Sequence, residues 1–131
     1  MSKSESIERL LTETELELMR ILWSLGQGTV RDVMAALPEG RDLAYTSVST
    51  MLRILEQKGF VTAAKAGRSH IYTPAVEKPR YEARTLRHMV GGLFEGSAGA
   101  LVRRLIDSGA VDDRELRDLQ QLLDERLGGD E

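Results

Sequence analysis

Four short hydroxyl side chains stand within five consecutive positions of this 131-residue chain: Thr46, Ser47, Ser49 and Thr50. Such hydroxyls donate hydrogen bonds to phosphates and base edges, and threonine methyls touch thymine methyls. The same residue types are poor helix formers, so an exposed helix face that keeps them needs another reason. The run therefore predicts a face that enters the major groove of DNA. The alternative is that Thr46 and Ser47 only cap a helix, which leaves the other two hydroxyls unexplained.

Three basic side chains extend this predicted DNA surface. Arg53 follows on the same predicted helix, where it is either a contact to a guanine edge or phosphate or a solvated surface arginine. Lys65 and Arg68 flank Gly67 in a predicted hairpin turn, a place from which a wing grips the DNA backbone. The alternative is an ordinary solvated turn. His70 and Tyr72, on the second strand of that hairpin, are expected to pack or to face solvent.

The charge of the chain is unevenly distributed. The total is −3, but residues 43–80 carry +4, whereas residues 1–42 carry −3 and residues 81–131 carry −4. A DNA-binding surface depends on local positive charge more than on the total, so the net acidity does not exclude nucleic acid. With so few charged residues, the uneven distribution could also arise by chance. The positions of the basic residues must decide between chance and a DNA-binding surface.

Catalysis and cofactor binding find no support in the residues. The chain has no cysteine, and its two histidines, His70 and His88, have no carboxylate at ligand spacing. The Gly91-Gly92 pair lacks the strand and lysine of a phosphate-binding loop. We therefore expect no enzyme, no metal and no cofactor. Without a long apolar run or a signal peptide, we also expect no membrane insertion and a cytoplasmic location.

Three helices and a hairpin are predicted to position the DNA-binding residues. The capping pairs Thr12/Glu15 and Thr29/Asp32 begin the first two helices, the second of which spans 30–37. The third helix spans 45–58 and ends before Gly59, a natural position after a helix. Strands at 60–62 and 69–73 form the hairpin. The order predicts a winged helix-turn-helix domain over residues 8–75.

Residues 76–131 are predicted to form a helical tail, which makes the whole chain mainly α. One helix covers 80–94, and two more begin at Ser97 and Asp112. About fifty residues seldom form a stable core alone, so the leucine-rich faces predict a dimer. The alternative is a tail that folds back on its own winged domain. The residues expected at the dimer interface are Leu86, Met89, Leu93, Leu101, Leu105, Leu116, Leu119 and Leu123.

Three segments resemble the penicillinase-repressor (BlaI/MecI/CopY) family of winged-helix transcriptional repressors. They are residues 11–19 with Leu22-Trp23, residues 43–52 with 55–61, and residues 67–72. The resemblance covers about residues 10–127. It implies a homodimer that occupies a palindromic operator on double-stranded DNA and blocks transcription, with the tail as dimerisation domain. It also implies that the outer residues of the third helix contact the operator.

Some family traits do not transfer to this chain. Ser49 replaces an arginine of the staphylococcal members, so their operator sequence is not carried over. The cysteine cluster of copper-responsive members is missing. The resemblance implies a membrane sensor or protease that acts on the tail, but Arg104-Leu105 stands where the family's cleaved Asn-Phe bond is expected, and the chain has no asparagine. A protein-interaction module and a ligand-released regulator remain as alternative functions.

Overall fold

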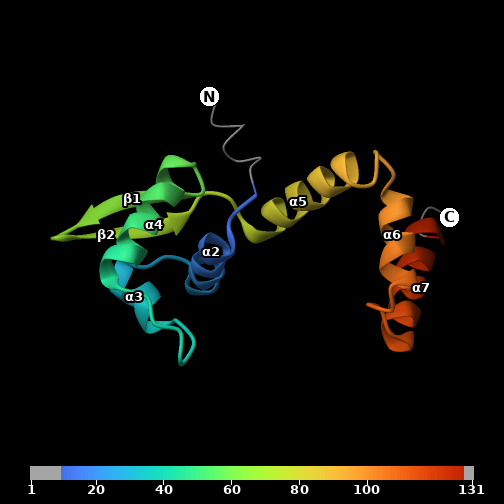
Figure 1. The fold of residues 1–131 in the computed structure, drawn as a ribbon, viewed down its shortest axis with the longest axis horizontal. Coiled ribbons are helices and arrows are strands. Elements are labelled where there is room, and N and C mark those ends of the chain that lie inside the picture. Colours follow the sequence, from blue (N-terminus) through green and yellow to red (C-terminus); the bar gives the residue numbers. More distant parts are fainter. Residues whose placement is uncertain (1–9, 129–131) are drawn as a thin grey trace. The chain divides into compact units, whose positions relative to one another are not determined.

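A computed structural model describes residues 10–128 of the chain, which divide into two compact units. The first unit ends at Leu86 and the second begins at Arg87. Residues 8 and 9 of the expected DNA-binding domain and residues 129–131 of the tail lie outside the described residues. Within residues 10–128 the element order is three helices, a two-stranded hairpin and three helices, and it confirms the predicted fold class (Figure 1).

Helices α2 (Glu13–Leu25) and α3 (Val30–Ala35) both begin with the predicted capping boxes. The Thr12 Oγ1 accepts from the Glu15 N–H at 3.2 Å, and Glu15 accepts in return from the Thr12 N–H at 2.8 Å. Thr29 and Asp32 exchange the same two bonds at 3.1 and 3.0 Å. Each pair satisfies backbone donors that a helix start leaves open, which places both starts at the predicted residues. Helix α3 ends earlier than the predicted residue 37.

Helix α4 (Tyr45–Gln57) is followed by strands β1 (Val61–Ala66) and β2 (Ser69–Pro74). Gly59, with φ +86°, ends the helix in a conformation that glycine adopts without strain. The strands pair antiparallel from Val61 with Pro74 to Ala66 with Ser69, so the first strand is longer than predicted. Gly67 has φ +63° at the first turn position, as a two-residue II′ hairpin requires.

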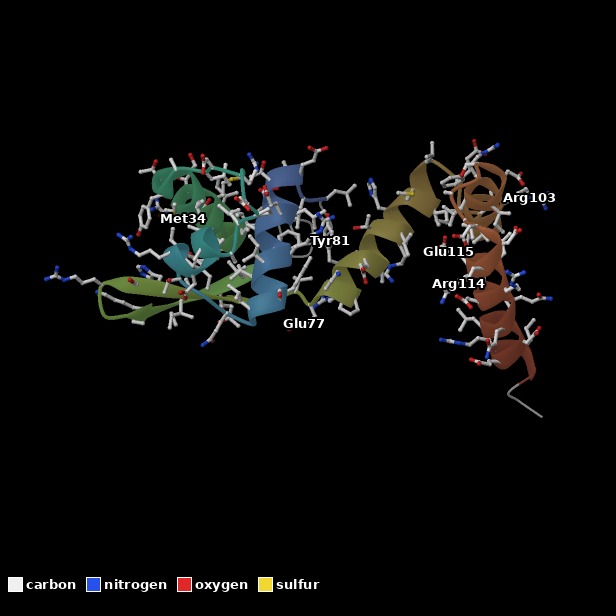
Figure 2. The ribbon with its side chains drawn as sticks, turned by 90° about the horizontal axis from the view of Figure 1, so that it is seen from below. Met34, Glu77, Tyr81, Arg103, Arg114 and Glu115 are labelled. Atoms are coloured by element: carbon white, nitrogen blue, oxygen red, sulfur yellow. The ribbon has the colours of Figure 1, made fainter. Side chains whose placement is uncertain are left out.

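The core of the first unit lies where these elements meet. Fully buried side chains come from all three helices and from Phe60, which precedes the hairpin. Helix α5 (Lys78–Gly92) begins in the same unit, and Tyr81 lies in its first turns (Figure 2). The Tyr81 ring is buried beside Trp23 and Phe60. The Tyr81 hydroxyl accepts from the Leu11 N–H at 2.9 Å, and the Trp23 Nε1 donates to the Val76 carbonyl at 2.9 Å. The compact unit thus extends past residue 75, where the sequence pattern placed the domain boundary.

The second unit contains the rest of α5 and helices α6 (Ala98–Asp107) and α7 (Asp113–Gly128). Ser97 caps α6 through a bond from the Ala100 N–H at 3.0 Å, and Asp112 accepts from the Glu115 N–H at 2.8 Å. Both starts match the predicted capping residues. No residue of α6 or of α7 is buried among those that the structure describes. Across residues 10–128, no helix combines the length and the apolar character that crossing a bilayer requires.

Candidate nucleic-acid interface

Helix α4 separates its apolar and polar residues onto different faces. Val48, Leu52 and Leu55 are fully buried and anchor the helix in the core. Thr46, Ser47, Thr50 and Arg53 are exposed, and Ser49 is half-buried. The apolar anchor fixes the orientation of the helix, and the small polar residues leave its backbone free to approach a partner closely. A helix of this kind fits a major groove about 12 Å wide.

The hydroxyl groups on α4 are not used to cap the helix. The N-cap residue is Ala44, which forms no side-chain capping bond. Within residues 10–128, none of the four hydroxyls takes part in a side-chain hydrogen bond. The alternative in which Thr46 and Ser47 serve as caps therefore does not describe this helix. Their hydroxyls are free to bond to another molecule.

A groove separates α4 from the hairpin and has a volume of about 420 Å³. We call it the α4–wing groove. Ser49 and Arg53 line it from α4, and Lys65 and Arg68 line it from the hairpin, so four of the seven predicted DNA-binding residues meet there. Thr46, Ser47 and Thr50 do not line it but lie exposed on the same helix. The remaining polar residues of the groove are Thr29, Arg31, Tyr45, Glu56, Ser69, His70 and Tyr72.

The groove keeps most of its positive charge unneutralised. Only two ion pairs occur among the described residues, Arg41–Glu17 and Lys58–Glu15, and neither includes a cation of the groove. Among the described residues that line the groove, Glu56 is the one carboxylate. Burial raises the pKa of the Tyr72 hydroxyl, the Glu56 carboxylate raises it further, and Arg53 opposes the rise. Tyr72 is 6% exposed and so packs in the core as expected, whereas His70 is exposed.

A partly buried ion pair ties the end of α4 to the start of α2. The Lys58 Nζ lies 2.7 Å from the Glu15 Oε2, and Glu15 is 4% exposed. Burial raises the pKa of the Glu15 carboxyl, but bonding to Lys58 and to the Thr12 backbone outweighs burial and lowers it overall. The Glu15 carboxylate is therefore charged at neutral pH, and its bond to Lys58 holds the C-terminal end of α4 in place. The sequence identified Glu15 only as a capping residue and did not indicate this second role.

Arg31 and Tyr45 are among the groove residues that the sequence reasoning missed. Arg31 lies on α3 and Tyr45 is the first residue of α4, and the Arg31 Cζ lies 5.4 Å from the centroid of the Tyr45 ring. Their separation along the chain gives no local signal, since no helical or strand periodicity relates positions so far apart. The turn between α3 and α4 brings them together.

The residues predicted for the dimer interface are all solvent-accessible. Leu101 and Leu116 are half-buried, and the exposure of the other six ranges from 38% for Leu119 to 76% for Leu93. Six of the eight are thus exposed large hydrophobic side chains. The Arg104-Leu105 bond lies inside helix α6, so a protease would need to unwind that helix to cleave it.

These features define a winged helix-turn-helix DNA-binding protein: an anchored helix with a free polar face, and a basic groove between it and a hairpin wing. Sequence comparison gives the family. A family model described as penicillinase repressor matches residues 11–125, so the chain belongs to the penicillinase-repressor family. This is a family of transcriptional repressors and not of enzymes.

Two relatives in sequence agree with this assignment. The chain is 24% identical over 115 residues to the penicillinase repressor of Bacillus licheniformis, covering 88% of this chain and 90% of the relative. It is 43% identical over 65 residues to the transcriptional regulator BlaI of Mycobacterium tuberculosis, covering 49% of this chain and 47% of the relative. Among solved structures, the DNA-binding domain of the repressor BlaI matches 54% of this chain and 87% of its own, with 28% identity and a TM-score of 0.49.

Proposed function

We propose that the chain is a homodimeric repressor that binds a palindromic operator and blocks a promoter by occupying it. The observation that carries the proposal is the pairing of free hydroxyls on α4 with unneutralised cations in the α4–wing groove. In this proposal the face of Thr46, Ser47, Ser49 and Thr50 enters the major groove. Arg53 contacts a base edge or a phosphate, and Lys65 and Arg68 contact the backbone.

The exposed apolar side chains of the second unit support the homodimer. An isolated three-helix segment with no buried residue in α6 or α7 gains little from burying apolar surface. A second copy offers the same apolar faces and would bury them in a two-fold interface. Two reading helices related by a two-fold axis suit a palindromic site with half-sites about 34 Å, or a multiple of it, apart. Such a repressor works in the cytoplasm, where the DNA is.

The experiment is a mobility-shift titration on the promoter upstream of the protein's own gene and on scrambled fragments. We expect a sequence-selective shift, and we expect Thr50→Ala with Arg53→Ala to weaken it by about tenfold or more. The matched control is Arg20→Ala with Thr62→Ala, which removes the same groups from exposed positions outside the groove. Circular dichroism checks that both variants fold.

Two results would contradict the proposal. A double variant at Thr50 and Arg53 that binds as well as the wild type would show that another face reads the operator. A complete lack of selective binding on any promoter fragment would favour a protein-interaction module instead.

Release of bound DNA on addition of a metabolite would be consistent with the repressor function and would identify that metabolite as its inducer. A protease acting at Arg104-Leu105 remains a further proposed partner, tested by incubation with membranes and analysis of the fragments.

A further inference from the structure

Tyr45 departs from the small-residue pattern of the α4 surface. It is a large aromatic residue at the first position of the helix, and it is 48% exposed. A bulky side chain at the start of a reading helix limits how closely the helix approaches the bases. Its position is explained by its neighbour, because the Arg31 guanidinium lies over its ring, with Cζ 5.4 Å from the centroid. The Tyr45 ring therefore supports the Arg31 side chain.

The backbone around Arg31 is fixed at two points, and its side chain contacts the Tyr45 ring. The Thr29–Asp32 capping box fixes the start of α3, where Arg31 lies. Gly28, just before that box, exchanges two backbone hydrogen bonds with Tyr72 of the wing, at 3.0 and 2.8 Å. The Tyr45 ring then supports the guanidinium itself. The backbone that carries Arg31 is thus tied to the wing, and its guanidinium contacts the first residue of the reading helix.

The guanidinium of Arg31 keeps its hydrogen-bond donors available. A ring that lies beneath the guanidinium does not use its N–H donors, unlike a carboxylate partner, which would occupy them. Arg41 provides the contrast, since its Nε donates to Glu17 at 3.1 Å. Among the described residues, Arg31 has no ion pair. A planar guanidinium with free donors matches the geometry of a phosphate group.

We propose that Arg31 is a phosphate-backbone contact of operator binding and that Tyr45 is the positioning residue that aims it. This inference rests on the proposed function. Arg31 lines the same groove as Arg53, Lys65 and Arg68. Arg31 therefore adds a contact from α3 to the DNA phosphate backbone, in addition to the contacts proposed for the wing. A backbone contact of this kind sets the register of the reading helix without reading sequence.

The test measures DNA affinity as a function of salt for Arg31→Gln. We expect affinity to fall on the order of tenfold, on selective and scrambled fragments alike, because a phosphate contact carries no sequence information. The slope of log affinity against log salt should decrease by about 0.9 for each phosphate that the variant no longer neutralises. The matched control is Arg41→Gln, which removes the same charge outside the groove and should leave the slope unchanged.

The role of Tyr45 is tested in a double-mutant cycle with Arg31. Tyr45→Phe keeps the ring and should bind DNA within about twofold of the wild type, whereas Tyr45→Ala should lose part of the Arg31 contribution. In the Arg31→Gln background, Tyr45→Ala should then have little further effect. If the Tyr45 ring serves only folding, Tyr45→Ala should lower the melting temperature, and the effects of the Tyr45 and Arg31 changes on DNA affinity should be additive.

The outcomes separate this inference from the proposed function. If the wild type binds selectively and Arg31→Gln has the same affinity and salt slope, the proposed phosphate contact is wrong. The proposed repressor function would still stand. Equal losses in Arg31→Gln and Arg41→Gln would also overturn it, because they would indicate a general charge effect. Absence of any DNA binding by the wild type would overturn the proposed function itself.

Discussion

The wing offers the most quantitative prediction. Lys65 and Arg68 line the α4–wing groove, are exposed, and have no ion pair among the described residues. Replacing both with glutamine removes two cations from each protomer, and so four from the proposed dimer. Each phosphate that is no longer neutralised lowers the slope of log affinity against log salt by about 0.9, so the slope should decrease by about 3.6.

This change in slope has a large effect on affinity. Over a rise from about 50 to about 200 mM salt, a slope difference of about 3.6 corresponds to roughly 150-fold. The wild type should therefore lose about 150-fold more affinity than the wing variant over that range. The assay is fluorescence anisotropy with a labelled operator duplex at several salt concentrations, repeated with a scrambled duplex, where the same change in slope is expected.

The control for the wing variant is Arg20→Gln with Arg41→Gln. It changes the net charge equally, and its residues lie outside the α4–wing groove. The Arg41–Glu17 pair that it breaks is partly exposed and contributes little to stability. If the wing variant and this control had the same slope as the wild type, the wing would not contact phosphates, and the assignment of Lys65 and Arg68 would be wrong.

Two further predictions concern stability and assembly. Lys58→Met leaves the buried carboxylate of Glu15 without its partner and should lower the free energy of unfolding by about 2 to 3 kcal/mol, measured with urea at pH 7. Folding lowers the pKa of Glu15, so its contribution to the free energy of unfolding is complete above the ordinary carboxyl pKa of about 4.3. That contribution is lost as the pH falls through the lower pKa of the folded state. A Lys58→Met variant whose stability depends on pH as steeply as that of the wild type would contradict this role. Leu119→Asp with Leu123→Asp should convert the proposed dimer to monomer in sedimentation velocity, whereas aspartates in place of the polar glutamines at 120–121 should not. If the dimer persists in the leucine variant, the interface must lie at other residues.

Much of the fold was predictable because its signals are local. A capping box needs only residues three apart, so Thr12 and Thr29 identified two helix starts from sequence alone. Gly67 marked the hairpin turn for a similar reason, since its positive φ suits glycine. The apolar residues of α4 follow the helical period, which separates the buried face from the hydroxyl-bearing one.

The boundary between units was less predictable from sequence. Residues 76–79 looked like a break because they separate the hairpin from a new helical pattern. The first turns of α5 nevertheless belong to the first unit, since Tyr81 is 8% exposed and accepts a hydrogen bond from Leu11. A single aromatic residue carries no sequence signal for which of two neighbouring cores it joins.

The amino-acid sequence by itself determined the elements, their buried faces and the free hydroxyls of α4, because each depends on residues within one or two helical turns. Tertiary structure decided what those elements bring together. It placed Lys58 against Glu15, set Arg31 over Tyr45, and gathered cations from α3, α4 and the wing around one groove. These contacts join segments that are distant along the chain, so they depend on how the helices and hairpin pack around the shared core and not on any local pattern.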